Sequence, residues 1–236
     1  MNAGVAERLT LEIDETQRVS ALLQLPPAAT ACFVFAHGAG AGMEHPSMSV
    51  VAADLATRSI ATLRFQFPYM ERRSRRPDPP PVCHATVRAA VAEAARLAPG
   101  LTLIAGGRSF GGRMTSQAQA LKPLPGVKGL AFLGFPLHPA GKPSVERAAH
   151  LDDVKIPMLF LQGTRDELAQ LDLLQPLIDC LGARATLKLL QDADHSFHVP
   201  ARTGRKDAEV RAEMLDALAT WIDLGASARA AREGVL

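Results

Sequence analysis

The feature that most constrains this chain is a serine set between two glycines directly after an apolar run. Residues 101–105 are strand-like, and Gly107, Ser109 and Gly111 follow them in a G-x-S-x-G pattern. A helix-compatible segment, 114–121, comes next. In a strand–turn–helix arrangement the serine occupies a strained turn with its hydroxyl outward, and the glycines let strand and helix approach closely. The pattern predicts a nucleophilic serine at the end of a central strand.

Strand-like and helix-like segments alternate along the rest of the chain. Strands are expected at 9–13, 19–25, 31–36, 61–67, 127–133, 157–162 and 185–190, and helices at 47–58, 82–97, 167–181 and 208–224. A proline-rich loop is expected over 68–81 and a fraying tail over 226–236. The alternation predicts an α/β fold, with a mostly parallel twisted sheet of about seven to eight strands and helices on both faces. Without a repeat or linker, 1–236 is expected to form a single domain, in which 136–153 leaves room for a minimal lid.

A serine needs a base and an acid to become a nucleophile, and two later strands supply candidates. Asp166 follows the strand 157–162, and His195 follows the last strand. The order serine, acid, histidine is the one this strand–turn–helix setting requires, so Ser109, Asp166 and His195 are the predicted catalytic residues. Alternatively, Asp166 caps a helix, or His198 serves as the base. A metal site at 192–198 has no matching ligand group elsewhere, so no metal is expected.

A reaction of this kind also needs backbone N–H groups for the developing oxyanion, and a glycine-rich loop at 37–42 is placed to supply one. Phe110, directly after the serine, is the first predicted donor. Ala39 is the second, with Gly40 as its alternative. The loop lacks both the P-loop lysine and the G-x-G-x-x-G dinucleotide pattern, so no cofactor is expected.

Composition narrows the class of protein further. The chain has 236 residues, 47% of them hydrophobic, and a formal net charge of +2, which gives no overall field for nucleic acid. Charged residues such as Glu7 and Arg8 interrupt any signal-peptide core, and no apolar run is long enough to span a bilayer. The three cysteines have no metal spacing. A cytoplasmic protein without nucleic-acid or membrane partners is expected, and a homodimer is left open.

Five motifs in order resemble the α/β-hydrolase superfamily, and more closely its small dienelactone-hydrolase-like branch. This branch is grouped with the testis-expressed and NSL-complex-subunit hydrolase-like domains. The motifs lie at 37–43, 64–71, 107–113, 162–166 and 194–197, and the likeness covers roughly Leu9 to Leu224. It implies an α/β-hydrolase fold. Dienelactone hydrolases carry a cysteine at the nucleophile, whereas this chain has Ser109, so their particular reaction is not implied.

The expected function is that of a serine hydrolase acting on an ester or thioester of a small to medium acyl group. Tyr69 is predicted to line the substrate site because of its loop position. The arginines of 72–76 either form a cationic rim for an anionic substrate or belong to a solvated loop. Some relatives of this branch act within protein complexes. The alternative is therefore a hydrolase-like interaction module with little turnover.

Overall fold

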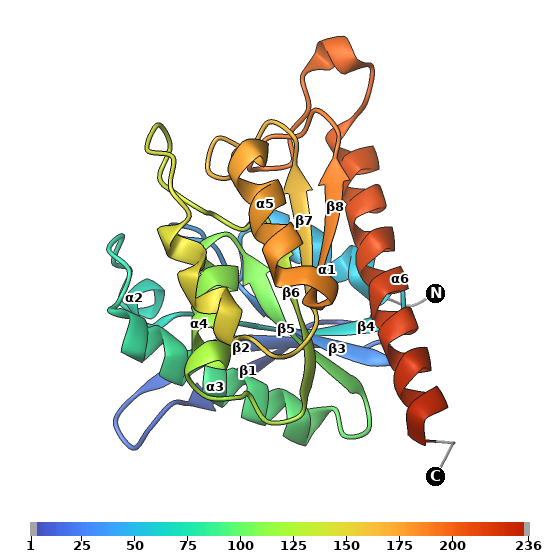
Figure 1. Cartoon of the computed structure of the whole chain (residues 1–236). Coiled ribbons are helices and arrows are strands. Elements are labelled where there is room, and N and C mark those ends of the chain that lie inside the picture. The colour runs from blue at the N-terminus through green and yellow to red at the C-terminus, as the bar shows by residue number, and fades with distance from the viewer. Residues whose placement is uncertain (1–3, 234–236) are drawn as a thin grey trace.

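The structure is a computed structural model in which residues 4–233 are described, with side chains through residue 227. Its strands form one eight-stranded sheet in the order β1-β2-β4-β3-β5-β6-β7-β8 (Figure 1). The strands are β1 (Glu7–Glu12), β2 (Arg18–Gln24), β3 (Ala31–Ala36), β4 (Ile60–Phe65), β5 (Thr102–Arg108), β6 (Val127–Leu133), β7 (Met158–Gly163) and β8 (Ala185–Leu190). The pairs β1–β2 and β2–β4 are antiparallel and all others are parallel, which confirms the predicted sheet.

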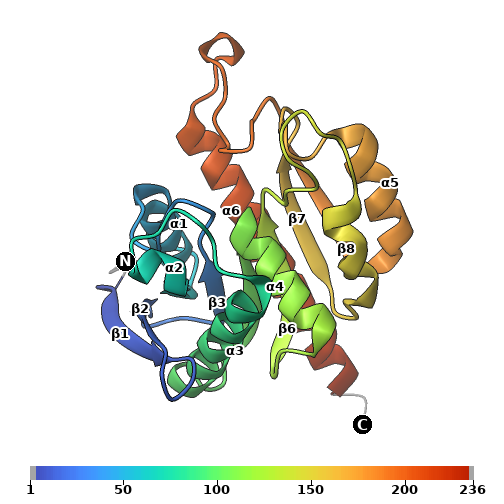
Figure 2. The same cartoon turned by 90° about the vertical axis from the view of Figure 1, so that its left-hand side faces the viewer.

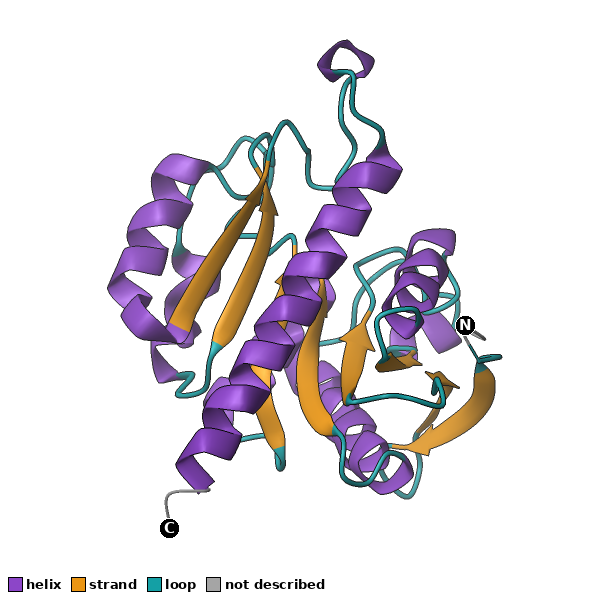
Figure 3. Cartoon of the chain, turned by 90° about the vertical axis from the view of Figure 1, so that its right-hand side faces the viewer, coloured by secondary structure: helices purple, strands orange, loops and turns teal. Residues whose placement is uncertain are grey.

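Helices cover both faces of this sheet. The helices are α1 (Pro46–Ala56), α2 (Pro68–Glu71), α3 (Pro80–Leu97), α4 (Phe110–Leu121), α5 (Leu171–Leu181) and α6 (Asp207–Glu233), with 3₁₀ turns η1 (Glu146–Asp153), η2 (Gly182–Arg184) and η3 (Ala201–Thr203). The helices α3, α4 and α5 lie on one face (Figure 2) and α6 and α1 on the other (Figure 3). Ser109, at the junction of β5 and α4, therefore lies at the middle of the sheet's carboxyl edge.

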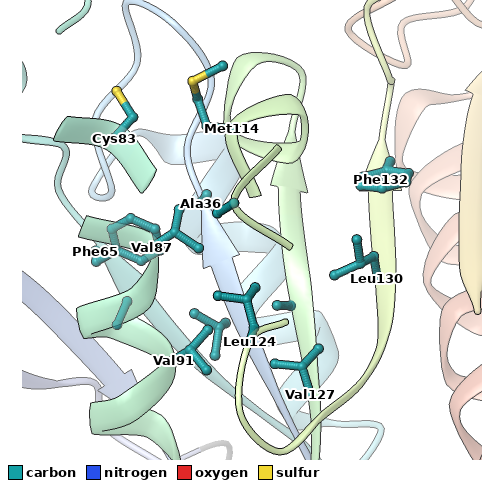
Figure 4. Packing of buried hydrophobic residues seen from close by; sticks show 14 of the residues in the cluster. Ala36, Phe65, Cys83, Val87, Val91, Met114, Leu124, Val127, Leu130 and Phe132 are labelled. Atoms are coloured by element: carbon teal, nitrogen blue, oxygen red, sulfur yellow. The ribbon is translucent and has the colours of Figure 1, made fainter. Parts of the chain in front are cut away.

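The apolar runs that predicted the central strands fill two cores. Because side chains alternate along a strand, Val34 of β3 packs toward α3 and α4, whereas Phe33 and Phe35 pack toward α1 and α6. Figure 4 shows the first core, in which Val87 of α3, Met114 of α4 and Phe132 of β6 converge on the sheet. Full burial of each large apolar side chain contributes about 1.5–3 kcal/mol, so these cores stabilise the part of the sheet that carries Ser109.

Three segments differ from the sequence-based prediction. The expected loop 68–81 contains α2 and the first turn of α3, because Pro68 and Pro80 occupy the first helical position, where the fixed φ of proline favours a helix start. The helix expected from Glu167 begins only at Leu171. The tail expected to fray from 226 continues α6 to Glu233, and 234–236 lie outside the described residues.

The segment 136–153, which left room for a lid, is held against the body of the protein in its second half, whereas residues 139–143 are exposed. Its η1 turn packs on α4, where Ala148 and Leu151 are buried in the core. His150 of this turn forms a hydrogen bond of 2.7 Å with the Ser116 hydroxyl of α4. Nothing in the described part of this segment forms a cover over Ser109. No helix among the described residues combines the length and apolarity needed to cross a membrane.

One outer edge of the sheet belongs to β8, which pairs only with β7 in the described chain. Lys188 of this strand forms an ion pair with Glu213 of α6, with Nζ and Oε1 2.7 Å apart. Arg205 reaches the other carboxylate oxygen of Glu213, also at 2.7 Å. The edge strand and the long helix beside it are thus joined by charge as well as by packing.

Candidate active site

Ser109 occupies the sharp turn that its sequence context predicted. Its backbone angles are φ 49° and ψ −116°, a region that favours glycine and strains any other residue. The Ser109 N–H donates to the carbonyl of Leu133 on the neighbouring strand β6, at 3.1 Å. This bond and the start of α4 fix the turn. The serine side chain stands at the sheet edge, where the residue is partly exposed.

The glycines on either side of Ser109 allow strands and helix to touch. A Cβ on Gly107 would lie 2.4 Å from the carbonyl oxygen of Ala36. A Cβ on Gly111 would lie 2.5 Å from the carbonyl oxygen of His37. Both distances are too short for any side chain, so the close approach of β3, β5 and α4 depends on glycine at these positions.

The residues predicted as acid and base converge on Ser109 from two other strand ends. Asp166 follows β7 and His195 follows β8, and the parallel strands bring both to the edge that holds Ser109. His195 Nε2 lies 2.8 Å from Ser109 Oγ, and His195 Nδ1 lies 2.7 Å from Asp166 Oδ2. The Asp166 side chain is fully buried, whereas that of His195 is 23% exposed. The three groups form a continuous hydrogen-bonded chain that reaches solvent at the serine end.

The Asp166 carboxylate is held by groups besides the histidine. The Leu168 N–H donates to its Oδ1 at 2.8 Å, and the Gln162 amide donates to its Oδ2. Gln162 is itself fixed, because its Oε1 accepts the Phe135 N–H at 2.9 Å. A carboxylate oriented in this way accepts the Nδ1–H of His195 and leaves Nε2 as the acceptor for the Ser109 hydroxyl proton.

The predicted oxyanion loop lies beside the serine. Gly38 is the neighbour of Ser109, since a Cβ placed on it would be 3.8 Å from Ser109 Cβ. Ala39 and Gly40 are the central residues of a turn that is closed by the Ala41 N–H and the Gly38 carbonyl, 3.4 Å apart. Both turn residues are exposed. Phe110, the other predicted donor, is the first residue of α4.

A buried histidine fixes this loop. His37 Nδ1–H donates to the Gly38 carbonyl at 2.8 Å, and His37 Nε2 accepts the Phe67 N–H at 3.0 Å. The two bonds define one neutral tautomer. Burial lowers the pKa of His37 to about 4, which keeps the ring uncharged. Through these two bonds His37 connects the loop after β3 to Phe67, which follows β4.

Tyr69, which was predicted to line the substrate site, lines neither of the two pockets beside the loop 194–198. Its side chain is fully buried, and its ring packs against Phe67 and Phe110, at centroid distances of 6.3 Å each. The helical turn α2 folds Tyr69 back into the core, a reversal that the proline-rich sequence did not reveal. Tyr69 therefore packs in the core against Phe110, the residue that follows Ser109.

The rival base, His198, lies apart from the serine. Its ring nitrogen Nδ1 pairs with Asp207 Oδ2 at 2.9 Å, and this partner raises the pKa of His198. His195 and His198 thus bind different carboxylates. Within the described residues, no three His, Cys, Asp or Glu side chains are grouped as a metal site would require.

Two pockets flank His195. One, of about 260 Å³, lies between α1 and α6 and is lined in part by Arg108 and Phe197. The other, of about 440 Å³, is lined in part by Arg165, Leu168 and His195 itself. The arginines of 72–76 line neither pocket. Of the three residues of the hydrogen-bonded chain, only His195 lines one of these pockets, the larger of the two.

Sequence reasoning overlooked three residues that the structure places at the site. Gln162 and His37 had been read only as parts of motifs, although both are polar residues at the end of an apolar strand, where a buried hydrogen bond is required. Arg108 lies within the 107–113 motif, whose interpretation rested on the glycines and the serine. Its position one residue before Ser109 could have identified it, because side-chain alternation along β5 directs the Arg108 side chain to the face covered by α1 and α6.

Comparison with known proteins agrees with this geometry. A family model described as "Alpha/beta hydrolase domain" matches residues 29–223. The chain belongs to the α/β-hydrolase domain family. The match includes all three residues of the hydrogen-bonded chain, from Ser109 to His195.

Solved structures of α/β hydrolases share the fold along nearly the whole chain. A dienelactone hydrolase from Anabaena variabilis has a TM-score of 0.74 at 20% identity, covering 93% of this chain and 97% of its own. A serine hydrolase without a lid from Xanthomonas campestris has a TM-score of 0.70 at 22% identity, covering 92% and 94%. The esterase domain of a Rhodothermus marinus protein has a TM-score of 0.69 at 18% identity, covering 92% and 97%.

Proposed function

We propose that this protein is a serine hydrolase that cleaves an ester or thioester of a small to medium acyl group through an acyl-enzyme. The observation that carries the proposal is the hydrogen-bonded chain from Ser109 through His195 to Asp166, with distances of 2.8 and 2.7 Å. A serine hydroxyl is a poor nucleophile by itself, and a base at this distance is the group that activates it.

In the proposed reaction Ser109 Oγ attacks the carbonyl carbon while His195 Nε2 takes the hydroxyl proton. His195 then passes that proton to the leaving alcohol or thiol, and the acyl group remains on Ser109. A water molecule, deprotonated by the same nitrogen, hydrolyses the acyl-enzyme. Asp166 holds the imidazole in its working tautomer and stabilises the imidazolium.

The negative oxygen formed in each attack needs N–H donors. Phe110 N–H at the start of α4 and Ala39 N–H in the turn beside Ser109 are the proposed donors, with Gly40 as the alternative to Ala39. Each donor in a comparable site contributes about 2.7–4 kcal/mol to stabilising the transition state. His37 maintains this arrangement through its bonds to Gly38 and Phe67.

The proposed substrate size follows from the surroundings. The pockets beside the loop 194–198 are small, and the η1 turn packs on α4. The structural likeness to a serine hydrolase from Xanthomonas campestris and to an esterase domain from Rhodothermus marinus further supports the reaction type.

The proposal is tested by covalent labelling and by hydrolysis of a panel of p-nitrophenyl esters and acyl thioesters. Wild-type protein is expected to react with a fluorophosphonate probe, and Ser109→Ala is expected to lose labelling. Ser109→Ala and His195→Ala should each lower kcat by roughly 10⁴-fold or more, because the members of a triad act as a unit.

His198→Ala is the matched control, since His198 is a nearby histidine that is bound to Asp207 instead of Ser109. It should keep the activity and the labelling. A folded wild-type protein that neither reacts with the probe nor cleaves any ester would contradict the proposal and favour an interaction module.

A further inference from the structure

Arg108, the residue directly before the nucleophile, is a partly buried cation that the proposed reaction does not use. Residues 104, 106 and 108 share one face of β5, and Ile104 belongs to the core under α1 and α6. The Arg108 side chain accordingly enters the 260 Å³ pocket between those helices. In the part of the chain with described side chains, its guanidinium has neither an ion pair nor a hydrogen bond.

The other charged groups that line this pocket already have partners. Arg211 Nε donates to Asp54 Oδ2 at 2.7 Å. Asp207 pairs with His198 and also accepts the Val199 N–H at 3.0 Å. Arg108 contributes a positive charge that no adjacent carboxylate neutralises, although Asp166 and Asp194 act on it from farther away. Burial lowers the pKa of Arg108, which reflects the cost of holding this cation away from water.

The walls around Arg108 are apolar. Phe35, Met48, Leu133 and Met214 line the pocket from β3, α1, β6 and α6. The Phe197 ring lies beneath the guanidinium, with its centroid 6.0 Å from Arg108 Cζ, in reach of a cation–π contact. Phe197 adopts a φ of 63°, an unfavourable angle for an aromatic residue. The backbone of the loop that carries His195 is therefore strained at the residue whose ring contacts Arg108.

We propose that Arg108 and this pocket form a subsite for a carboxylate at the far end of the substrate's acyl chain. The preferred substrates are then esters or thioesters of a short dicarboxylic acid. The apolar walls hold the methylene groups, and the guanidinium binds the carboxylate with charge-assisted hydrogen bonds. The acyl half is assigned here because it stays bonded to Ser109 until water releases it, and Arg108 is the chain neighbour of Ser109. A pocket smaller than those that hold drug-sized ligands fits a chain of this kind.

This inference rests on the proposed hydrolase function, and the experiment separates the two. The p-nitrophenyl monoester of adipic acid and p-nitrophenyl hexanoate have acyl chains of the same length and differ in a terminal carboxylate. Wild-type protein should show the higher kcat/KM for the adipate ester. In Arg108→Gln the ratio of the two kcat/KM values should fall by about 10- to 100-fold, the range of a lost hydrogen bond to a charged group. Arg108→Lys, which keeps the charge, should retain part of the preference.

Two control variants test whether the change in the ratio of kcat/KM values comes from Arg108 itself. Arg75→Gln removes an exposed arginine of the 72–76 loop and should leave the ratio unchanged. Arg211→Gln removes the paired arginine of the same pocket and should lower the ratio less than Arg108→Gln. If Arg108→Gln slows both esters equally, Arg108 serves only to balance the charge of Asp166 and Asp194, and the subsite proposal is overturned.

A binding measurement decides the subsite even if no ester is cleaved. Calorimetry with the Ser109→Ala protein should detect binding of monomethyl adipate that exceeds binding of methyl hexanoate, and adding Arg108→Gln should abolish the difference. Equal binding of the two esters would overturn the subsite. Absence of both probe labelling and ester cleavage would instead count against the hydrolase function.

Discussion

At the scale of single residues, the site is built from side chains whose conformations are fixed by neighbours. Gln162 and Leu168 orient Asp166, which orients His195, which faces Ser109. His37 fixes the opposite side of the serine through two hydrogen bonds. Each group has little freedom left, so the geometry needed for attack exists before any substrate arrives.

The strained backbone of Ser109 has a measurable consequence for stability. At φ 49° and ψ −116°, a Cβ is unfavourable, and glycine alone relieves the strain. Ser109→Gly should be more stable than Ser109→Ala by about 1 kcal/mol, after the larger backbone entropy of unfolded glycine is subtracted.

Urea denaturation of the two inactive variants measures this difference directly. Both lack the hydroxyl, so hydrogen bonding to His195 is lost equally in the two. An alanine variant as stable as the glycine variant would show that the turn is unstrained.

At the scale of elements, the site depends on how closely three of them meet. The strands β3 and β5 and the first turn of α4 are in contact through backbone atoms at Gly107 and Gly111. This contact sets the height of Ser109 above the sheet and brings the 37–42 loop next to it. A shift between these elements would change the distance between the proposed oxyanion donors and Ser109.

Gly111→Ala should therefore destabilise the protein. The added methyl group would lie 2.5 Å from the His37 carbonyl oxygen, so strand and helix must separate at a cost of about 1–3 kcal/mol. Thermal or urea unfolding measures the loss.

Gly38→Ala is the matched control for stability. A Cβ at this position would make contacts no shorter than 3.7 Å, which are ordinary van der Waals distances. Its free energy of unfolding should stay close to that of the wild type. An equal loss in both variants would mean that the close approach at Gly111 is not the cause.

At the scale of the whole molecule, the buried His37 and the half-buried His150 couple folding to pH. Burial is the main cause that lowers the pKa of His37 to about 4 and that of His150 to about 4, against about 6.5 in an unfolded chain. Between these values the unfolded chain binds protons that the folded protein excludes. Stability should therefore decline as the pH falls from 6.5 toward 4, by at most about 1.4 kcal/mol per pH unit for each such histidine.

Urea midpoints measured across that range check this prediction, and His150→Gln should lose less stability than the wild type on acidification. His198→Gln is the control with the opposite sign. Asp207 raises the pKa of His198, so this pair adds stability at low pH and loses it as the pH rises through the raised pKa. An identical acid profile in His150→Gln and wild type would contradict the assignment.

Much of the fold and the proposed triad could be predicted from the sequence because both depend on local patterns. Apolar runs identify the parallel strands, and chain order alone brings Asp166 and His195 to the edge that holds Ser109. The path of the chain after β4 could not be predicted, since the same prolines suit a loop and a helix start. The burial of Tyr69 depended on that path. The absence of a bonded partner for the Arg108 guanidinium could not be predicted either. It depends on residues of α1, α6 and the 194–198 loop, which only the folded chain brings together.

The edge strand β8 has its outward backbone groups available for a strand from another molecule, which is how open sheets join into larger assemblies. Lys188 lies within this strand and is joined to Glu213 of α6. A strand added here would have to accommodate that ammonium group or break its ion pair. A lysine on an edge strand is one of the features by which proteins discourage edge-to-edge pairing of sheets, so β8 is a poorer template for a second strand than an uncharged edge would be.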